Sequence, residues 1–329
     1  MAICLNELGP GVEPRLVAPA LSASRAAEPT VSVIITCYNQ AQFLAEAIDS
    51  ALQQTYPASE IIVVDDGSTD GTPGIAARYR RVRYVRQRNQ GLSSASNVGL
   101  KAARCPYLTF LAADDRLLPG AIKAGVSCIE THPDCAFVSG HYRMIDADGG
   151  LLDFEPCACA VKNHYRELLR GNYIGMHATV LYRRGVLQRV GGFDVALQHC
   201  EDYDLYLRIA RRWPIYCHHR VVAEYRLHGA NKSRRNHAML RSVLRVLRAQ
   251  SRYVRGSPDL EEAYRAGIYG WQRYYGEPLI GETVAGLRDP TRWTSVAVGV
   301  ASLLRYYPRG LCDLLAHKIS AARARRRHA

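Results

Sequence analysis

The feature that most constrains the fold is a repeated alternation of short apolar runs and amphipathic segments in the first third of the chain. β-Branched, apolar runs cover residues 31–36, 61–64, 82–85 and 107–111. Such runs are typical of strands that are buried on both faces. Residues 43–52 and 92–103 repeat their apolar side chains at helical spacing, and Pro73 behind Thr72 begins a further helix. The alternation predicts right-handed crossovers, and therefore an α/β fold whose mainly parallel, twisted sheet has helices on both faces.

A second pattern begins near residue 130, where shorter strands and longer loops replace the regular alternation. Strands are expected at 136–142, 178–182 and 221–227, and a helix at 201–212. From residue 233 the chain is predicted to be helical and basic, with one apolar face formed by Met239, Leu240, Val243, Leu244 and Leu247. Residues 1–29, rich in Ala, Pro and Ser, are expected to be a flexible leader. The chain is thus divided into this leader, an α/β domain over 30–232 and a basic C-terminal helical extension over 233–329.

Composition narrows the choice of partners. The 43 Lys and Arg residues against 30 Asp and Glu give a formal net charge of +13, which favours an anionic partner such as phosphate, nucleic acid or acidic lipid. No recognisable nucleic-acid module or interleaved aromatic platform is present in the sequence, so nucleic acid is not expected as a partner. The most apolar late run, residues 296–304, is far shorter than the ~20 residues of a transmembrane helix. We therefore expect a protein that is soluble or lies on a membrane surface.

The ten cysteines show no metal-ligand spacing, and a chain of 329 residues does not need disulfide bonds for its stability. Cys157 and Cys159 form a close pair, but one intervening residue fits neither a Cys-x-x-Cys redox motif nor a zinc knuckle. The cysteines are therefore expected to be mostly free thiols in a reducing compartment.

Two acidic pairs follow predicted strands, Asp65-Asp66 directly and Asp114-Asp115 after two alanines. A carboxylate of Asp65-Asp66 could accept hydrogen bonds from a nucleobase or ribose, with Gly67 allowing a tight turn, although the same residue types are common in ordinary loops. Adjacent carboxylates such as Asp114-Asp115 repel unless a cation neutralises them, which favours a hard divalent ion that also binds substrate phosphates. The alternative for this pair is a solvated acidic loop. Because ligands bind at the carboxyl ends of parallel strands, both pairs are expected to face one crevice.

A third acidic segment, Glu-Asp-Tyr-Asp, covers residues 201–204. On a helix, the face of Asp202 is shared by three apolar side chains: Leu205, Tyr206 and Ile209. Asp202 is therefore predicted to point inward, whereas Glu201, Asp204 and Arg208 lie off this face. An inward carboxylate with a raised pKa suits a general base for a hydroxyl group, and the alternative is a helix N-terminal carboxylate that interacts with the helix dipole. Asp204 and Arg208 are expected to form a surface ion pair.

His228 follows the last predicted strand, together with Asn231 and Ser233. A neutral imidazole can complete a metal shell or hydrogen-bond a phosphate. A histidine in a loop at a strand end is more often an ordinary polar surface residue, so both interpretations stay open. The sequence after the first strand decides against a dinucleotide-dependent oxidoreductase, because Cys-Tyr-Asn-Gln stands where Gly-x-Gly-x-x-Gly is needed.

Seven segments follow one another in a fixed order between about residues 31 and 233. They are VSVIITCYNQ, IIVVDDGSTDGT, NQGLSSASNVGL, YLTFLAADD, VGGFD, EDYDLYLR and YRLHGANKS. This order resembles the serial motifs of glycosyltransferase family 2, which are inverting enzymes with the GT-A fold. The resemblance implies that 30–232 is a GT-A catalytic domain, with a nucleotide-binding half over 30–118 and an acceptor half over 119–232.

The resemblance also implies roles for particular residues. Contacts to the nucleotide sugar are expected from Thr36, Tyr38, Asn39, Asp65, Asp66, Asn97 and Asp114, with Asp66 at the nucleobase. A divalent metal ion, Mg²⁺ or Mn²⁺, is expected on Asp114 and Asp115, and His228 matches a position that touches the metal or the diphosphate. The catalytic base is similar to Asp202, with Glu201 beside it. The segment that shapes the sugar and acceptor pocket resembles Gly191, Gly192, Phe193 and Asp194.

Two positions depart from the family pattern. Ala112 stands where many relatives carry Asp, which removes a carboxylate that could hold ribose or metal. Ser96 stands where many carry Arg, which weakens the expected contact with the nucleotide or its phosphates. The alternative to an enzyme is therefore a non-catalytic member that binds a nucleotide sugar within a membrane biosynthetic complex.

Together these features predict an inverting, metal-dependent glycosyltransferase that uses a nucleoside-diphosphate sugar. Its acceptor is expected to be a saccharide or a lipid-linked sugar, in polysaccharide or glycolipid synthesis at the cytoplasmic face of the cell membrane. The tail favours peripheral association with an anionic membrane surface, since apolar residues recur at helical spacing before a basic cluster: Leu311, Leu314, Leu315, Ile319 and Ala322, then Arg323, Arg325, Arg326 and Arg327. The alternative is that these leucines dock the last helix on the catalytic domain.

Overall fold

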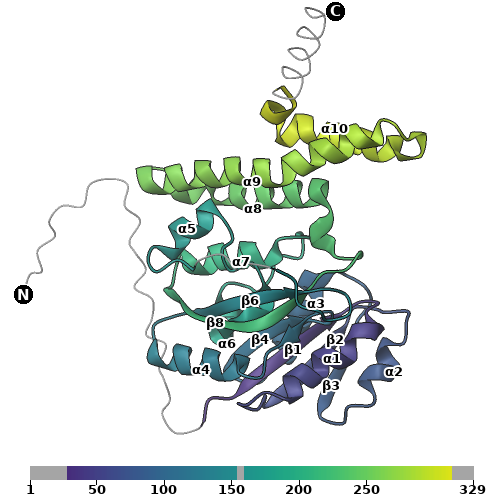
Figure 1. The fold of residues 1–329 in the computed structure, drawn as a ribbon. Helices are drawn as coiled ribbons and strands as arrows, with labels where there is room; N and C mark the ends of the chain where they lie inside the picture. The colour runs from purple at the N-terminus through teal and green to yellow at the C-terminus, as the bar shows by residue number, and fades with distance from the viewer. Residues whose placement is uncertain (1–27, 154–158, 313–329) are drawn as a thin grey trace, which may run out of the picture.

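The structure, a computed structural model, describes residues 28–153 and 159–312 of the chain. Nearly all of the expected leader lies outside these residues, as does the basic tail beyond Cys312 on which the membrane prediction rests. The described residues form a sheet flanked by helices, with a stack of long helices above it (Figure 1).

The first half of the sheet follows the predicted alternation. It contains β1 (Val31–Cys37), α1 (Ala41–Leu52), β2 (Glu60–Asp65), α2 (Thr72–Ala76), β3 (Val82–Arg86), α3 (Leu92–Ala102) and β4 (Tyr107–Ala112). β1 pairs in parallel with β2 and with β4, and β2 pairs in parallel with β3. The four predicted strands are thus confirmed. β1, β2 and β4 are buried on both faces, as their apolar runs predict, whereas β3 at the sheet edge is only partly buried.

The second half of the sheet is mixed. It contains β5 (Arg116–Leu117), α4 (Ala121–Thr131), β6 (Phe137–Ile145), α5 (His164–Arg170), the 3-10 turn η1 (His177–Thr179), β7 (Val180–Arg183), α6 (Arg184–Arg189), α7 (Glu201–Ala210), β8 (Ile215–Arg226) and the 3-10 turn η2 (Lys232–Arg234). The strand order is β3-β2-β1-β4-β7-β6-β8-β5, in which β6 and β8 are parallel and the pairs that involve β5 or β7 are antiparallel. The last strand begins at Ile215, six residues before its predicted start, because the polar run at 217–220 hides its apolar alternation.

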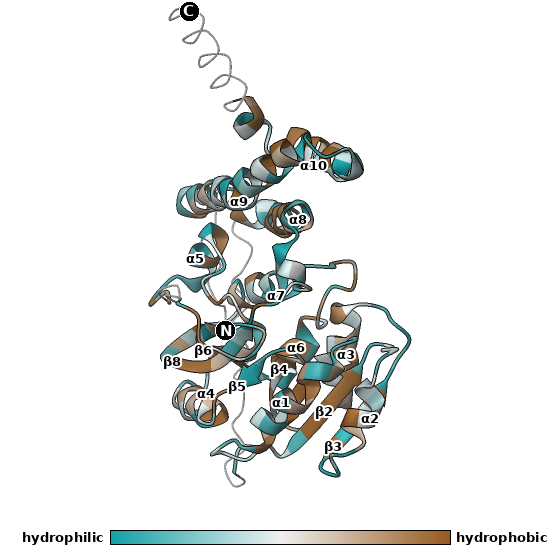
Figure 2. Ribbon diagram, turned by 45° about the vertical axis from the view of Figure 1, so that its right-hand side comes forward, coloured by the Kyte–Doolittle hydropathy of each residue, from teal (hydrophilic) through white to brown (hydrophobic). Residues whose placement is uncertain are grey.

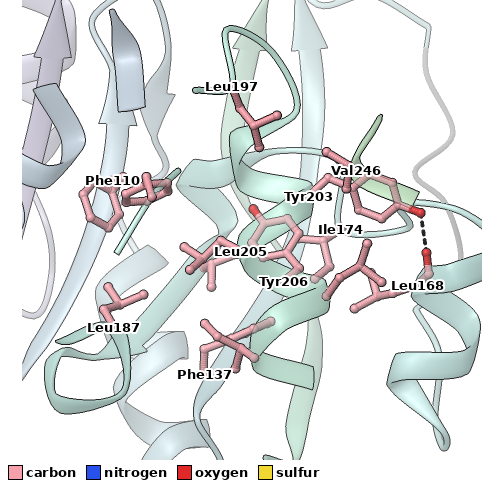
Figure 3. Packing of buried hydrophobic residues seen from close by; sticks show 14 of the residues in the cluster. Phe110, Phe137, Leu168, Ile174, Leu187, Leu197, Tyr203, Leu205, Tyr206 and Val246 are labelled. Atoms are coloured by element: carbon pink, nitrogen blue, oxygen red, sulfur yellow. Dashed lines mark hydrogen bonds between the residues drawn. The ribbon is translucent and has the colours of Figure 1, made fainter. Parts of the chain in front are cut away.

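Both faces of the sheet are covered by helices. Side chains that alternate along β1 enter two separate cores, Ile34 on one face and Val33 and Ile35 on the other. α1, α2 and α4 cover the face of Val33, whereas α3, α6 and α7 cover the face of Ile34. β2 is correspondingly apolar along most of its length, as its brown colour shows (Figure 2). The larger core joins the sheet to α7 through packed aromatic and aliphatic side chains (Figure 3).

The C-terminal region is helical, as predicted, and packs on the larger core. It contains α8 (Asn236–Val254), α9 (Pro258–Gly286), the 3-10 turn η3 (Pro290–Arg292) and α10 (Trp293–Tyr306). Four of the five residues of the predicted apolar face of α8 are buried: Leu240, Val243, Leu244 and Leu247. α9 lies along α8 (Figure 1). Within residues 28–312, no helix has both the length and the apolar character needed to cross a membrane.

Most of the described cysteines are free, with Cys37, Cys105 and Cys135 buried. Cys159 and Cys217 differ from them, because their sulfur atoms are joined in a disulfide across 58 residues of sequence. Their spacing gave no indication of this pairing.

Candidate functional site

The two acidic pairs lie at the same edge of the sheet, as the parallel register requires. Cys37 at the end of β1 is opposite Asp65 of β2, and Thr36 is opposite Ala112 of β4. Asp114 and Asp115 follow Ala112 by two and three residues. The carboxyl ends of β1, β2 and β4 therefore bring both pairs together, and Thr36 lies buried between the two strands.

Asp65 is fully buried and anchors its own turn. Its Oδ1 accepts a hydrogen bond from the backbone N–H of Ser68 at 2.7 Å, and its Oδ2 accepts one from the Tyr84 hydroxyl. Arg86 adds an ion pair at 3.6 Å. Gly67 has a φ of 79°, and a Cβ there would lie 2.8 Å from the backbone nitrogen of Asn89. The tight turn predicted at this glycine is confirmed, since an L-residue would be strained and would clash.

Asp66 organises the loop that follows β3. Its Oδ1 accepts from the Gln90 N–H at 2.9 Å and from Gln87 Nε2 at 2.6 Å, and its Oδ2 accepts from the Gly91 N–H at 2.8 Å. A carboxylate has about four acceptor positions, so these bonds leave one open on Oδ2. Asp66 therefore holds a loop at the sheet edge and retains one acceptor position for a ligand.

The loop after β1 lies against the loop after β2. Asn39 has a φ of 52°, accepts a hydrogen bond from the Thr69 N–H at 2.8 Å and donates its own N–H to Ser68 Oγ at 2.9 Å. Asn tolerates this left-handed conformation better than most residues. Tyr38, next to it, keeps 45% of its surface exposed. Asn39 thus fixes the loop, and the Tyr38 ring is accessible at the edge that carries Asp65 and Asp66.

Asp114 and Asp115 point to different partners. Asp114 Oδ2 lies 3.0 Å from Nε2 of His228, whereas Asp115 Oδ1 accepts the backbone N–H of Arg226 in β8 at 2.9 Å. Burial raises the pKa of Asp115 well above its usual range, and the negative charge of Asp114 raises it further. The structure therefore brings together Asp114 and His228 of the three predicted metal ligands, and turns Asp115 toward β8.

Asp114 and His228 fit a divalent ion. Adjacent ligands of an octahedral ion, each about 2.1 Å from it, lie roughly 3 Å apart, which matches the 3.0 Å between the two side chains. A carboxylate oxygen and an imidazole nitrogen suit Mn²⁺, and the oxygen suits Mg²⁺. Asp114 and His228 would therefore hold such an ion.

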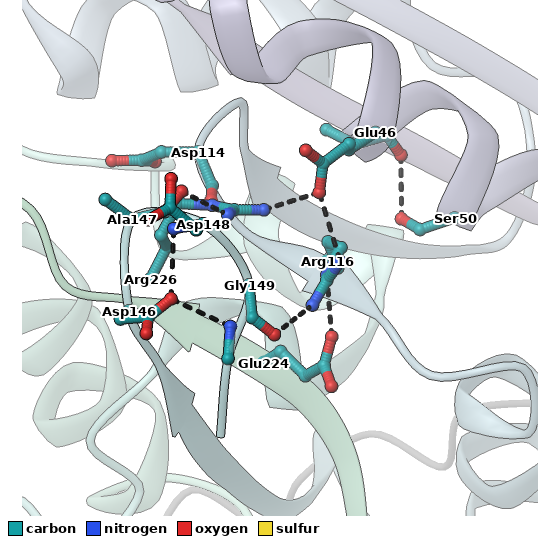
Figure 4. A network of polar contacts seen from close by, with 12 residues as sticks. Glu46, Ser50, Asp114, Arg116, Asp146, Ala147, Asp148, Gly149, Glu224 and Arg226 are labelled. Atoms are coloured by element: carbon teal, nitrogen blue, oxygen red, sulfur yellow. Dashed lines mark hydrogen bonds and ion pairs between the residues drawn. The ribbon is translucent and has the colours of Figure 1, made fainter. Parts of the chain in front are cut away.

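The buried side chain of Arg226 lies against Asp114, a role that the sequence did not predict. Its guanidinium is 1% exposed and donates to the backbone oxygens of Asp114 at 2.9 Å and Ala147 at 2.8 Å, and to Glu46 Oε2 at 2.6 Å (Figure 4). It also lies over the ring of Phe43, 4.8 Å from the ring centre. A buried charge needs such partners, so Arg226 fixes the position of the Asp114 backbone.

Asp202 lies in the first turn of α7, which begins at Glu201 after Cys200 in a left-handed conformation. Burial raises the pKa of Asp202 to about 7, with a further contribution from the charge of Glu201. Asp202 keeps part of its surface accessible. The raised pKa predicted for this carboxylate is thus present in the structure, on a side chain that solvent still reaches.

The expected orientation of the neighbouring residues is wrong. Asp204 is 7% exposed and Glu201 is 8% exposed, so both are more buried than Asp202. Asp204 binds Arg208 Nε at 2.7 Å, and Arg208 also donates to the backbone oxygen of Gly192 at 2.7 Å. Instead of a surface ion pair, Asp204 and Arg208 form a largely buried pair that holds a loop, because α7 is surrounded on nearly all sides.

Tyr225 connects the two acidic regions, and it too was not singled out from the sequence. Its hydroxyl hydrogen-bonds Ser233 Oγ at 2.8 Å. Burial raises the pKa of Tyr225 to about 12, and the negative charges of Asp115, Asp114 and Asp202 raise it as well. One side chain therefore lies within electrostatic range of the acidic pair between β4 and β5 and of Asp202 on α7. Tyr225 and Arg226 both belong to the YRLHGANKS segment, and that membership is the sequence feature from which their place near the site could have been predicted.

The loop at 191–194 is fixed by Asn97. The Asn97 amide accepts the Phe193 N–H and donates to the Phe193 oxygen, both at 2.9 Å. Gly192 has a φ of 69°, and a Cβ there would lie 2.4 Å from Asn97 Oδ1. The Phe193 ring is buried against Phe110, with 5.0 Å between ring centres, and Asp194 accepts the N–H two residues further on. In this structure Asn97 and Phe193 support the loop, and their predicted contacts with the nucleotide and the sugar stay predictions.

Comparison with known proteins places part of this chain in a known family. Residues 32–191 match the family model of glycosyl transferase family 2. An uncharacterized glycosyltransferase of Rickettsia prowazekii is 35% identical over 61% of this chain and 65% of its own length. A chondroitin synthase of Escherichia coli is 31% identical over 64% of this chain and 31% of its own length. The chain thus spans less than two thirds of these curated relatives.

Solved structures show the same fold. S. aureus TarS 1–349 in complex with UDP has a TM-score of 0.57 at 18% identity, covering 75% of this chain and 72% of that one. A mannosyltransferase of Pyrobaculum calidifontis in complex with GDP-Man and Mn²⁺ has a TM-score of 0.55 at 19% identity, covering 90% and 91%. Residues 32–191 therefore form a glycosyl transferase family 2 domain, and the described chain has the GT-A fold.

Proposed function

We propose that this chain transfers a sugar, with inversion, from a nucleoside-diphosphate donor to an acceptor hydroxyl, and that Asp202 is the catalytic base. The observation that carries the proposal is the placement of Asp202, whose pKa of about 7 suits proton abstraction near neutral pH. The negative charges of Asp115, Asp114 and Asp202 all raise the pKa of Tyr225, so the proposed base and Asp114, a proposed metal ligand, both lie within electrostatic range of this side chain. A base close to a metal ligand suits a single displacement at a sugar phosphate.

In the proposed reaction Asp202 accepts the proton of the acceptor hydroxyl. The acceptor oxygen then bonds to the anomeric carbon while the bond from that carbon to the diphosphate oxygen breaks, so the configuration inverts. Asp114 and His228 would hold a divalent ion, which supplies neutralising charge for the diphosphate when bound. Tyr225, with its pKa raised, stays protonated and can donate a hydrogen bond at neutral pH.

The donor nucleoside is proposed to bind at the edge formed by β1 and β2. Asp66 retains an acceptor position for a base N–H, and the accessible ring of Tyr38 offers a stacking surface. Asn39 and Asp65 hold the two loops in place. We assign residues 30–118 to donor binding, 119–232 to the acceptor and the base, and the helices beyond 233 to support of this acceptor half.

The acceptor is proposed to be a saccharide chain or a lipid-linked sugar in cell-surface polysaccharide or glycolipid synthesis. The relative named chondroitin synthase, at 31% identity, supports a polysaccharide. The formal charge of +13 favours a location beside anionic lipid at the inner face of the cell membrane. Deletion of residues 309–329 should abolish sedimentation with anionic liposomes at low salt, and full-length protein that ignores such liposomes would contradict this location.

Turnover by Asp202→Asn tests the proposed function. The full chain is incubated with a panel of nucleotide sugars and Mn²⁺, and released nucleoside diphosphate is measured beside donor binding by thermal shift. Asp202→Asn should bind the donor as wild type does and lose at least about 100-fold in turnover. Asp134→Asn, which alters an exposed carboxylate in the turn after α4, is the matched control and should keep wild-type turnover. Binding without turnover in wild type would favour the non-catalytic alternative.

A further inference from the structure

Four side chains with metal-binding atoms gather where β6 and β8 meet the segment before α5. Among the residues that the structure describes, His141, Cys159, Cys217 and His219 place one nitrogen or sulfur atom each within 4.8 Å of all the others. Cys159 Sγ is 3.9 Å from His141 Nε2, and Cys217 Sγ is 4.0 Å from His219 Nδ1. Two cysteines and two histidines from three separate segments therefore converge on one point.

An irregularity in the sheet creates this arrangement. Ser139 pairs with Cys217 and His141 pairs with Val221, so two steps along β6 match four steps along β8. The surplus residues of β8 form a bulge in which His219 has a φ of 55°. Bulges redirect side chains, and a positive φ is uncommon outside glycine. Here the bulge brings the side chains of Cys217 and His219 beside His141.

Gly140 allows the bulge to approach β6. A Cβ at this position would lie 2.3 Å from Cε1 of His218 and 2.7 Å from the backbone oxygen of Arg220. Both distances are shorter than real contacts, so a larger residue would push the bulge away from β6. The glycine next to His141 therefore permits the close packing that gathers the four side chains.

We propose that His141, Cys159, Cys217 and His219 form a structural zinc site. A Cys₂His₂ set in tetrahedral geometry is a common closed zinc site. Ligand atoms 2.0–2.3 Å from such an ion lie roughly 3.3–3.8 Å apart, close to the 3.9 and 4.0 Å observed between the sulfur and nitrogen atoms. Thiolate and imidazole ligands favour zinc over Mg²⁺. Four protein ligands fill the shell, which leaves no position for a substrate.

The site binds zinc in its dithiol form. Each cysteine loses its proton as its sulfur bonds to the ion, so one Zn²⁺ replaces two protons and the two thiolates balance its charge. No electron is transferred. The disulfide between Cys159 and Cys217 uses the same two sulfur atoms and is the competing state, which requires an oxidant to remove two electrons.

Zinc at this point would fasten the segment that leads into α5 to β8, 58 residues further along the chain. α5 packs in turn against α9 (Figure 1). Because the four ligands come together only in the folded chain, the free energy of zinc binding adds to the free energy of folding. The site is separate from Asp114 and His228, and its test does not depend on the proposed transferase activity.

The test measures the zinc content of the full chain after purification in a reducing buffer. Excess Mg²⁺ is present to compete with zinc at the proposed ion site on Asp114. We expect one zinc per chain by mass spectrometric metal analysis, and a chelator should then expose Cys159 and Cys217 to alkylation. Cys217→Ser and His141→Ala should each lower zinc affinity at least about tenfold. Cys128→Ser is the matched control, since Cys128 also lies 3.9 Å from a histidine, His132, and should keep full zinc content.

Cobalt gives a second measurement that needs no variant. Co²⁺ in a tetrahedral thiolate site has intense visible and near-ultraviolet absorption, so wild type titrated with Co²⁺ alone should show these bands, and Zn²⁺ should remove them. The proposal is overturned if reduced wild type binds less than a tenth of an equivalent of zinc and shows no thiolate–cobalt band. It is equally overturned if Cys217→Ser still binds a full equivalent, or if the Cys159–Cys217 disulfide persists in the reducing buffer.

Discussion

The pH dependence of turnover follows from the environment of Asp202. Burial, and next the charge of Glu201, raises its pKa from 3.8 to about 7. A general base works in its deprotonated form, so activity should fall as the pH drops through this value. With a pKa of about 7, roughly nine-tenths of the side chains are ionised at pH 8 and about a tenth at pH 6, so kcat/KM should fall about tenfold between these values. An aspartate with an ordinary pKa would show no change over this range.

Glu201→Gln provides the internal check. Removing the neighbouring negative charge should lower the pKa of Asp202 and move the acid limb of the profile to lower pH, because the repulsion that disfavours the ionised Asp202 is then absent. Initial rates at saturating Mn²⁺ and limiting donor, measured from pH 5.5 to 8.5 in buffers of about constant ionic strength, give the profile. A flat profile in wild type, or one that Glu201→Gln leaves in place, would refute the assignment of Asp202.

Three further predictions concern separate parts of the site. Asp114→Ala should remove the metal dependence of nucleoside-diphosphate binding, whereas Asp66→Ala should weaken this binding with or without metal. Calorimetric titrations measure both affinities, and equal losses of affinity in the two variants under both conditions would contradict these separate roles. Arg226→Met leaves the buried backbone carbonyl of Asp114 without its donor and should lower the free energy of unfolding by about 1–3 kcal/mol. A loss below about 1 kcal/mol in urea denaturation would contradict this role. Gly192→Ala should destabilise more than Gly191→Ala in the same assay, since both have positive φ but only the first has atoms within 4 Å of a new Cβ.

The first half of the fold could be predicted from the sequence because β1, β2 and β4 are largely apolar runs between helical segments, although the edge strand β3 alternates with arginines and is only partly buried. β1 and β4 are covered on both faces, so their sequences contain the whole signal. β8 is different: its first residues are followed by Cys-His-His-Arg in a bulge, and the alternation by which a strand is recognised is lost there. α5 and α6 are short and have few apolar positions, which leaves too little periodicity to detect.

The candidate site shows the same limit. The positions of Asp66, Asp114 and Asp202 at element ends could be predicted, because they follow strands or begin a helix. Their hydrogen-bond partners could not be predicted, because they are distant in the sequence. Arg226 in β8 donates to the side chain of Asp115 and to the backbone oxygen of Asp114, which are more than 100 residues away. The prediction that Asp204 lies at the surface was wrong. Helical spacing shows which residues of a helix share a face, but α7 is buried on nearly all of its faces.

The configuration of the product decides whether the sugar is transferred by a single displacement. A nucleotide sugar accepted in the donor panel is incubated with the full chain, Mn²⁺ and a saccharide acceptor, and the anomeric coupling of the transferred sugar is read by proton NMR. If the transfer inverts, a new glycoside should form whose anomeric configuration is opposite to that of the donor. Its amount should equal that of the released nucleoside diphosphate, and Asp202→Asn should form none. A product with retained configuration would contradict the single displacement, and bound donor without any glycoside would contradict transferase activity itself.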